Sequence, residues 1–204
     1  MKRFGAAAVT AVFLVGCASV NGTSLAGGDP SASSSIQRPV FWQAHGAGVG
    51  REVDRPTSLK ELGGKVGVVA LGRITGYAEG RDYTDPGRPP NKTGNVEIAV
   101  QKSSSDVRLP GTMRVEFTRH PLMTADEAKK ALPEGEFIFF LTDWYSDEKG
   151  AVYRCTSPSL CVLGVDDGQL ISLREPDAAI DLATERSNRR YPAVEDIYSE
   201  ATSG

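Results

Sequence analysis

Short apolar segments, separated by turns rich in glycine and proline, run through the middle of this 204-residue chain. Residues 65–74 and 136–142 are apolar almost throughout, which is typical of strands covered on both faces. Residues 96–101 and 113–118 alternate apolar and polar side chains, which predicts two half-buried strands paired antiparallel. This pattern excludes collagen and coiled coil and favours a mainly β fold. Further short strands are expected at 152–154, 160–165 and 169–173, the last two joined by a hairpin turn at 166–168.

Helix and loop signals lie between these strands. Ser58 and Glu61 have the spacing of a capping box, and so do Thr124 and Glu127, so we expect a short helix after each serine or threonine. The polar stretch 79–93 contains Asp-Pro-Gly and Pro-Pro-Asn, and it predicts an irregular loop.

The order of these elements bears on the fold class. Strand, long loop, hairpin, helix, central strand and hairpin follow one another as in OB-like barrels, which the chain resembles through residues 68–74, 96–100 and 135–141. The same segments resemble uncharacterised lipoproteins of the bacterial envelope. We therefore expect a mainly β domain over residues 39–174, folded as a small closed or partly open β-barrel (OB-like) with one or two short helices. A β-sandwich is the alternative.

The C-terminal segment, residues 175–204, differs in character from this domain. It is rich in charged side chains and poor in large apolar ones. We expect a partly disordered segment, with a short surface helix over residues 177–189 and a loose tail after it.

The N-terminal residues 1–16 have the anatomy of a signal peptide. Two basic residues are followed by an uncharged, largely apolar stretch at residues 5–15. As a helix this stretch would be ~16 Å long, about half of the ~30 Å hydrocarbon core, so it is too short to span a bilayer.

A lipobox-like motif ends this signal. Leu14-Val15-Gly16-Cys17 closely resembles the lipobox of bacterial lipoproteins, in which the cysteine receives a diacylglycerol and becomes the first residue after cleavage. The resemblance implies an extracytoplasmic protein anchored to the bacterial cell membrane by lipid at Cys17. Residues 17–38, rich in Ser, Gly and Ala, would then form a flexible tether with a reach of about 25 Å. The alternative is an ordinary secretory signal in which Cys17 is incidental.

The two remaining cysteines, Cys155 and Cys161, are predicted to form a disulfide, because an even pair in an exported protein is most simply explained as a bridge. A metal site and a redox dithiol are the alternatives. A metal site lacks companions, since the two histidines, His45 and His120, show no paired ligand spacing. A redox pair usually has two intervening residues, and here there are five.

Charge and motifs indicate neither nucleic acid nor a reaction. The formal net charge is −3, and the sequence contains no long run of basic residues, so a nucleic-acid partner is excluded. No catalytic set, cofactor motif or metal site is predicted, because a nucleophile needs a base within reach and no nucleophile elbow occurs. We expect His45 to pack where the chain enters the barrel, beside Phe41 and Trp42, and His120 to lie in a loop.

Three aromatic residues are the candidates for ligand or partner contact: Trp144 and Tyr145 after the central strand, and Tyr83 in the polar loop. The leading hypothesis is a lipid-anchored lipoprotein whose non-catalytic β-domain binds an envelope protein, a glycan or another ligand. The alternative is an envelope hydrolase that acts on glycan or peptide through carboxylates such as Asp82 and Asp85. A third hypothesis is a structural or maturation role.

Overall fold

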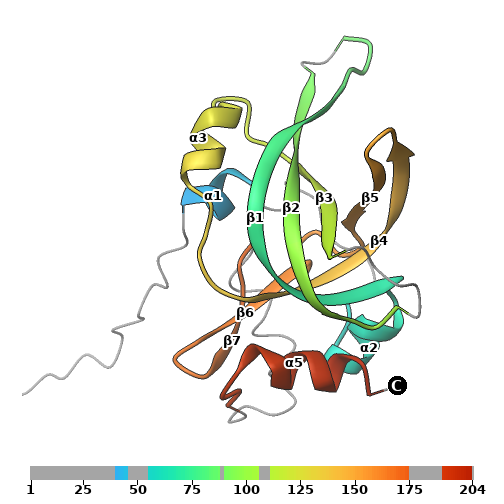
Figure 1. Ribbon diagram of the computed structural model, residues 1–204, viewed down its shortest axis with the longest axis vertical. Helices are drawn as coiled ribbons and strands as arrows, with labels where there is room; N and C mark the ends of the chain where they lie inside the picture. The colour runs from blue at the N-terminus through green and yellow to red at the C-terminus, as the bar shows by residue number, and fades with distance from the viewer. Residues whose placement is uncertain (1–39, 46–54, 88–89, 106–110, 175–189, 204) are drawn as a thin grey trace, which may run out of the picture. The chain divides into compact units, whose positions relative to one another are not determined.

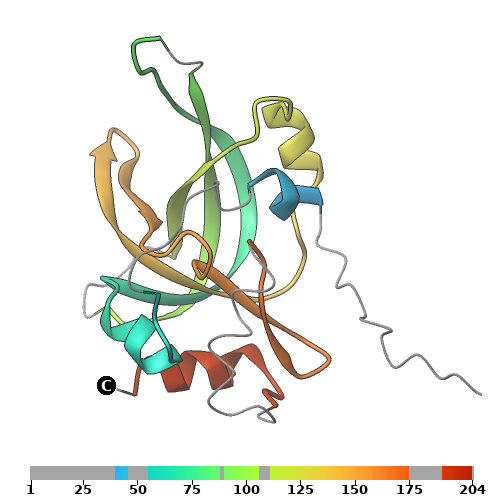
Figure 2. The same cartoon turned by 180° about the vertical axis from the view of Figure 1, so that it is seen from behind.

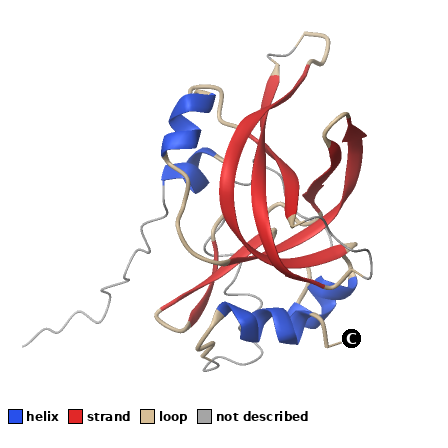
Figure 3. Cartoon of the chain, in the orientation of Figure 1, coloured by secondary structure: helices blue, strands red, loops and turns tan. Residues whose placement is uncertain are grey.

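The computed structural model describes residues 40–45, 55–87, 90–105, 111–174 and 190–203. These residues form a mainly β fold with one seven-stranded sheet and four short helices, shown by type in Figure 3. The predicted signal, lipobox, tether and surface helix over 177–189 lie outside the described residues. The strands are β1 (Val68–Tyr83), β2 (Asn91–Ser103), β3 (Thr112–Thr118), β4 (Phe137–Asp147), β5 (Gly150–Cys155), β6 (Val162–Asp166) and β7 (Gln169–Ser172). The helices are α1 (Val40–Ala44), α2 (Leu59–Gly64), α3 (Ala125–Lys130) and α5 (Val194–Ala201).

Five of the strands close into a ring of pairings. The sheet order is β1-β2-β3-β5-β4-β6-β7, and β4 also pairs with β1 (Figure 1). The ring closes because β1 is long: its first residues pair with β4 while most of the strand pairs with β2. The mainly β prediction is therefore confirmed, and a single sheet with a closed ring stands in place of the two facing sheets of a sandwich.

The pairing of β2 with β3 confirms the period-two prediction. The two strands are antiparallel, with Val96 opposite Val115 and Ile98 opposite Met113. Because these four side chains fall on one face, the strands bury that face and leave most polar side chains on the other. The parallel pairing of β3 with β5 completes that side of the ring.

Both faces of the first halves of β1 and β4 are covered, which explains the nearly continuous apolar sequence of these halves. Along β4, Phe137, Phe139 and Leu141 pack with one hydrophobic cluster, which also holds residues of β2, β3 and α1. The alternate side chains Ile138 and Phe140 pack with a second cluster, formed with α2, α5 and the β6–β7 hairpin. Where the two strands are shared by both clusters, over residues 68–72 and 137–141, they have no solvent-facing side, so neither set of alternating positions carries polar residues there.

The prediction of an irregular loop over 79–93 is wrong for residues 79–83 and 91–93, which belong to strands, and residues 84–87 form the loop. The strands β1 and β2 continue as a long hairpin, with Glu79 opposite Gly94 and Tyr83 opposite Asn91. Main-chain hydrogen bonding across the hairpin does not depend on side-chain hydropathy, so polar strands with both faces near solvent can extend well beyond the core. The Asp-Pro-Gly sequence forms the turn region instead, where Gly87 has a φ of 79°.

The helices agree with the capping signals. The Ser58 side chain accepts from the Glu61 N–H at the start of α2, and Thr124 and Glu127 form a reciprocal capping box at the start of α3. The predicted turn at 166–168 also joins β6 to β7, with Asp167 and Gly168 both at positive φ.

The expectation of a loose tail is wrong for residues 190–203. They carry α5, which lies beside α2 in both views (Figures 1 and 2), with Ile197 and Ala201 buried against Leu59 and Leu62. Positions 197 and 201 are one helical turn apart, so two apolar residues suffice to make one buried face. This helix is thus part of the folded domain.

Candidate functional site

The three aromatic candidates meet at one carboxylate. The Tyr83 hydroxyl donates to Glu116 Oε1 at 2.7 Å, and the Trp144 indole Nε1 donates to the same oxygen at 3.1 Å. The Tyr145 hydroxyl donates to Glu116 Oε2 at 3.0 Å. The structure thus brings Tyr83, Trp144 and Tyr145 together, around a residue that the sequence analysis did not single out.

Strand geometry explains the position of this carboxylate. In β3, Val115 and Phe117 face the core, so the intervening Glu116 projects from the opposite face of the sheet. In a regular strand, Trp144 and Tyr145 would point to opposite faces. The register of β4 against β5 shifts between Asp143 and Tyr145, and this bulge allows both aromatic side chains to reach Glu116.

Aromatic rings and guanidinium groups surround Glu116, which is 9% exposed. The Arg81 guanidinium carbon lies 3.4 Å from the centroid of the Tyr145 ring, and that of Arg154 lies 3.9 Å from the centroid of the Trp144 ring. Each is a cation–π contact with a ring of the cluster around Glu116. The β1–β2 hairpin and the β4–β5 hairpin are joined through this cluster.

The tyrosines are held as hydrogen-bond donors. Burial, followed by the hydrogen bond to Glu116, raises the pKa of Tyr83 and that of Tyr145 above the usual value for tyrosine. A tyrosinate beside a carboxylate would place two negative charges in contact, so both hydroxyls keep their protons across the physiological range. We call Glu116 and its three donors the Glu116 network.

A cavity of about 340 Å³ opens beside the Glu116 network. All five strands of the ring contribute to its wall, as does the segment after β7. Its volume is in the range of small-ligand sites, and its wall combines aromatic, amide, hydroxyl and guanidinium groups. Residues that matter for its chemistry are Tyr83, Asn91, Glu116, Trp144, Arg154 and Arg174.

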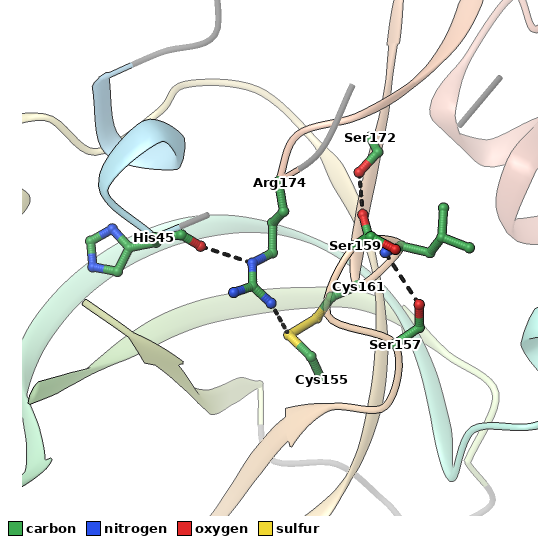
Figure 4. The surroundings of a disulfide bond; sticks show 8 residues. His45, Cys155, Ser157, Ser159, Cys161, Ser172 and Arg174 are labelled. Carbon is green, nitrogen blue, oxygen red and sulfur yellow. Dashed lines mark hydrogen bonds between the residues drawn. A yellow bond between two sulfur atoms is a disulfide. The ribbon is translucent and has the colours of Figure 1, made fainter. Parts of the chain in front are cut away.

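Cys155 and Cys161 form a disulfide (Figure 4). The bridge supports one wall of the cavity, which Cys155 and Pro158 help to line. The predicted bridge is therefore confirmed. Arg174 connects the bridge to the residue that follows α1: its Nε donates to the carbonyl oxygen of His45 at 2.8 Å, and its Nη1 lies 3.2 Å from the Cys155 Sγ. The bridge thus fixes both a loop and a cationic side chain at the cavity.

Replacing Cys155 and Cys161 together with serine is expected to lower the free energy of unfolding by about 2 kcal/mol, because so short a closed loop constrains the unfolded chain only modestly. Denaturant unfolding of the oxidised parent and of the double variant measures the difference. The oxidised parent treated with a reductant should match the double variant within about 0.5 kcal/mol. Equal stability of all three proteins would contradict the prediction.

The carboxylates of the hydrolase hypothesis lie away from the cavity wall. Asp82 pairs with Lys92 across the β1–β2 hairpin at 3.6 Å, and both side chains are exposed. Asp85 is exposed in the turn region of the same hairpin. Of the described residues that line the cavity, Glu116 alone is acidic.

The histidines occupy structural and surface positions. His45 is 0% exposed and is stacked on Phe41, as expected for a residue packed where the chain enters the domain. Its Nδ1 donates to the Phe41 carbonyl oxygen at 2.8 Å, and its Nε2 accepts from the Tyr77 hydroxyl at 3.0 Å. His120 is exposed after the end of β3.

Further observations bear on class. Within the described ranges, no three or more His, Cys, Asp or Glu side chains are grouped to hold a metal ion. The helices of this part of the chain are too short or too polar to cross a membrane. Comparisons with protein-family models, curated proteins and solved structures find no match to the chain.

Proposed function

We propose that this chain is a lipid-anchored extracytoplasmic lipoprotein whose non-catalytic β-domain binds an envelope ligand or partner in the cavity beside Glu116. The convergence of Tyr83, Trp144 and Tyr145 on one buried carboxylate carries the binding half of the proposal. The hydrogen bonds of this network fix the orientation of aromatic side chains at a cavity. Preorganised aromatic groups are typical of recognition sites.

Two features support binding over hydrolysis. Glycoside hydrolysis through carboxylates needs two such groups flanking one bond, and Glu116 has no acidic companion among the described lining residues. The cavity also shares its wall with a disulfide and with Arg174, which donates a hydrogen bond to the backbone of His45 just after α1. A rigid wall of this kind suits recognition of a preformed shape.

The anchoring half of the proposal rests on the lipobox-like sequence ending at Cys17. Two acyl chains give stable membrane attachment where one gives marginal attachment. The segment 17–38 would then allow the domain to sample the space beside the membrane.

Intact mass of the protein from native membranes tests the anchor. We expect a chain that begins at Cys17 and carries the added mass of a diacylglycerol, whereas Cys17→Ser should remain unprocessed and unmodified. The Cys155→Ser and Cys161→Ser double variant is the matched control and should still carry the lipid. An unmodified parent chain that begins at another residue would refute lipidation.

Site-specific photo-crosslinking in the native envelope tests the cavity as the binding site. A photoreactive amino acid at Asn91, which is exposed and lines the cavity, should capture a defined species. The same group at exposed Lys60 on α2 should not capture that species. Identical products at positions 91 and 60 would count against the cavity.

A further inference from the structure

The cavity wall carries guanidinium groups as well as a carboxylate. Arg154 and Arg174 both line it, and Glu116 is the one acidic residue of the described wall. The two oxygens of Glu116 already accept three hydrogen bonds from Tyr83, Trp144 and Tyr145. The Glu116 oxygens are therefore engaged by the protein's own donors, so the cavity offers a ligand the Arg154 guanidinium rather than the Glu116 carboxylate.

Arg154 is the donor best placed to meet a ligand. Its side chain is exposed and lies over the Trp144 ring, but it forms no hydrogen bond or ion pair with another described residue. A planar guanidinium held on an aromatic ring keeps its N–H groups in the plane of the group, ready for a bidentate contact with a carboxylate. The stacking contact removes part of the entropy cost of ordering this side chain.

Trp144 supplies an aromatic surface next to that donor. It is 39% exposed, although its indole N–H is used by Glu116 and lies 3.1 Å from the Tyr83 hydroxyl oxygen. Its orientation is therefore fixed, while part of its ring remains open to solvent. The C–H face of a sugar ring packs on such a surface, and the exposed side chains of Asn91 and Thr118 offer polar partners for hydroxyl groups.

We propose that the cavity binds an acidic saccharide, with the ligand carboxylate on Arg154 and a sugar ring against Trp144. This inference rests on the proposed binding function and specifies its ligand class. A neutral saccharide would leave the Arg154 donors unused, and a small inorganic anion would leave the Trp144 surface uncovered. The combination of both groups on one wall selects a ligand that has both features.

Tryptophan fluorescence gives a direct test, because the chain has two tryptophans and Trp42 is 0% exposed. The full-length protein is titrated with trigalacturonate, with its neutral methyl ester and with inorganic phosphate. We expect a saturable change with trigalacturonate, at least about tenfold weaker binding of the ester, and no saturation with phosphate in the same range. Arg154→Gln should remove the preference for the acid, and Arg73→Gln, an exposed arginine on β1 outside the cavity, should retain it. The fluorescence change should disappear in Trp144→Phe, which checks that the optical signal comes from Trp144. Calorimetry measures the affinity of that variant without an optical signal.

The outcomes separate this inference from the proposed function. Equal affinities for acid and ester, or an unchanged preference in Arg154→Gln, would overturn the acidic ligand while leaving the cavity as a binding site. If inorganic phosphate bound as tightly as trigalacturonate, the proposal that the ligand is a saccharide would be overturned. Failure of both saccharides, together with capture of a protein at position 91 by photo-crosslinking, would overturn the ligand class and keep the binding function. Failure of both experiments would overturn both.

Discussion

Glu116→Ala is expected to lower the free energy of unfolding by about 3 kcal/mol, because it removes the acceptor shared by three hydrogen-bond donors. Tyr83, Trp144 and Tyr145 would each lose a hydrogen bond to a charged group. The two tyrosine donors would be left without this acceptor at a cost of roughly 1 to 2 kcal/mol each, whereas the Trp144 indole N–H could still donate to the Tyr83 hydroxyl. Because these residues join the β1–β2 hairpin to the β4–β5 hairpin, the loss should also loosen the cavity wall. Denaturant unfolding at neutral pH measures the change.

Matched variants separate this network from the general effect of losing a carboxylate. Glu148→Ala, an exposed position in the β4–β5 turn, should change the free energy of unfolding by less than about 0.5 kcal/mol. Glu116→Gln retains one acceptor oxygen, so its loss should lie between the two. In a double-mutant cycle, Tyr145→Phe and Glu116→Ala should be non-additive by about 1 kcal/mol. A Glu116→Ala effect no larger than that of Glu148→Ala would show that the network does not stabilise the fold.

Much of the fold was predictable because local rules and tertiary structure agree in it. The period-two segments pair as β2 and β3, and the doubly apolar segments are shared by two hydrophobic clusters. The capping boxes at Ser58 and Thr124 begin helices, and the even cysteine pair forms a bridge. In each case the signal lies within a few residues of the structure that it determines.

The polar half of the β1–β2 hairpin could not be predicted in this way. Main-chain pairing, and not burial of side chains, holds these strands together, so the pattern of apolar residues in the sequence does not indicate them. The helix α5 was missed for a related reason. Its buried face contains only Ile197 and Ala201, and the partner that covers this face, α2, is more than a hundred residues earlier in the sequence.

Only part of the candidate site could be predicted from the sequence: its three aromatic residues, but not Glu116. Trp144 and Tyr145 were candidates because aromatic residues at the end of a strand are a general signal for recognition, and Tyr83 was a candidate because it lies in the polar segment expected to be a loop. Glu116 looked like an ordinary solvent-facing residue of an alternating strand. Its burial depends on side chains that are 33, 28 and 29 residues away in sequence, and the bulge in β4 that brings two of them together has no local signature.

Acidification from pH 7 to pH 5 is expected to reduce the free energy of unfolding by about 2 kcal/mol through one buried histidine. Burial lowers the pKa of His45 from 6.5 to about 4, against the raising effect of its hydrogen bond to the Phe41 carbonyl and aided by the nearby charge of Arg174. The folded protein therefore keeps this ring neutral where the unfolded chain binds a proton. Stability is complete above about pH 6.5, falls as the pH decreases, and loses no more through this group below about pH 4.

His45→Gln should flatten the pH dependence between pH 7 and pH 5 even though it also lowers stability at neutral pH, so the slope is the quantity to compare. His120→Gln, at an exposed position, is the matched control and should keep the slope of the parent. Hydrogen bonds with Lys65 and Arg114 lower the pKa values of the Glu61 and Asp147 carboxyls to about 2. The stability that these carboxylates contribute is therefore lost only below about pH 5, where carboxyls of the unfolded chain begin to bind protons. Denaturant unfolding in half-unit steps above that pH therefore isolates His45. A slope that persists in His45→Gln would assign the pH dependence to another group and would remove the buried neutral imidazole from the account of how α1 is held against β1.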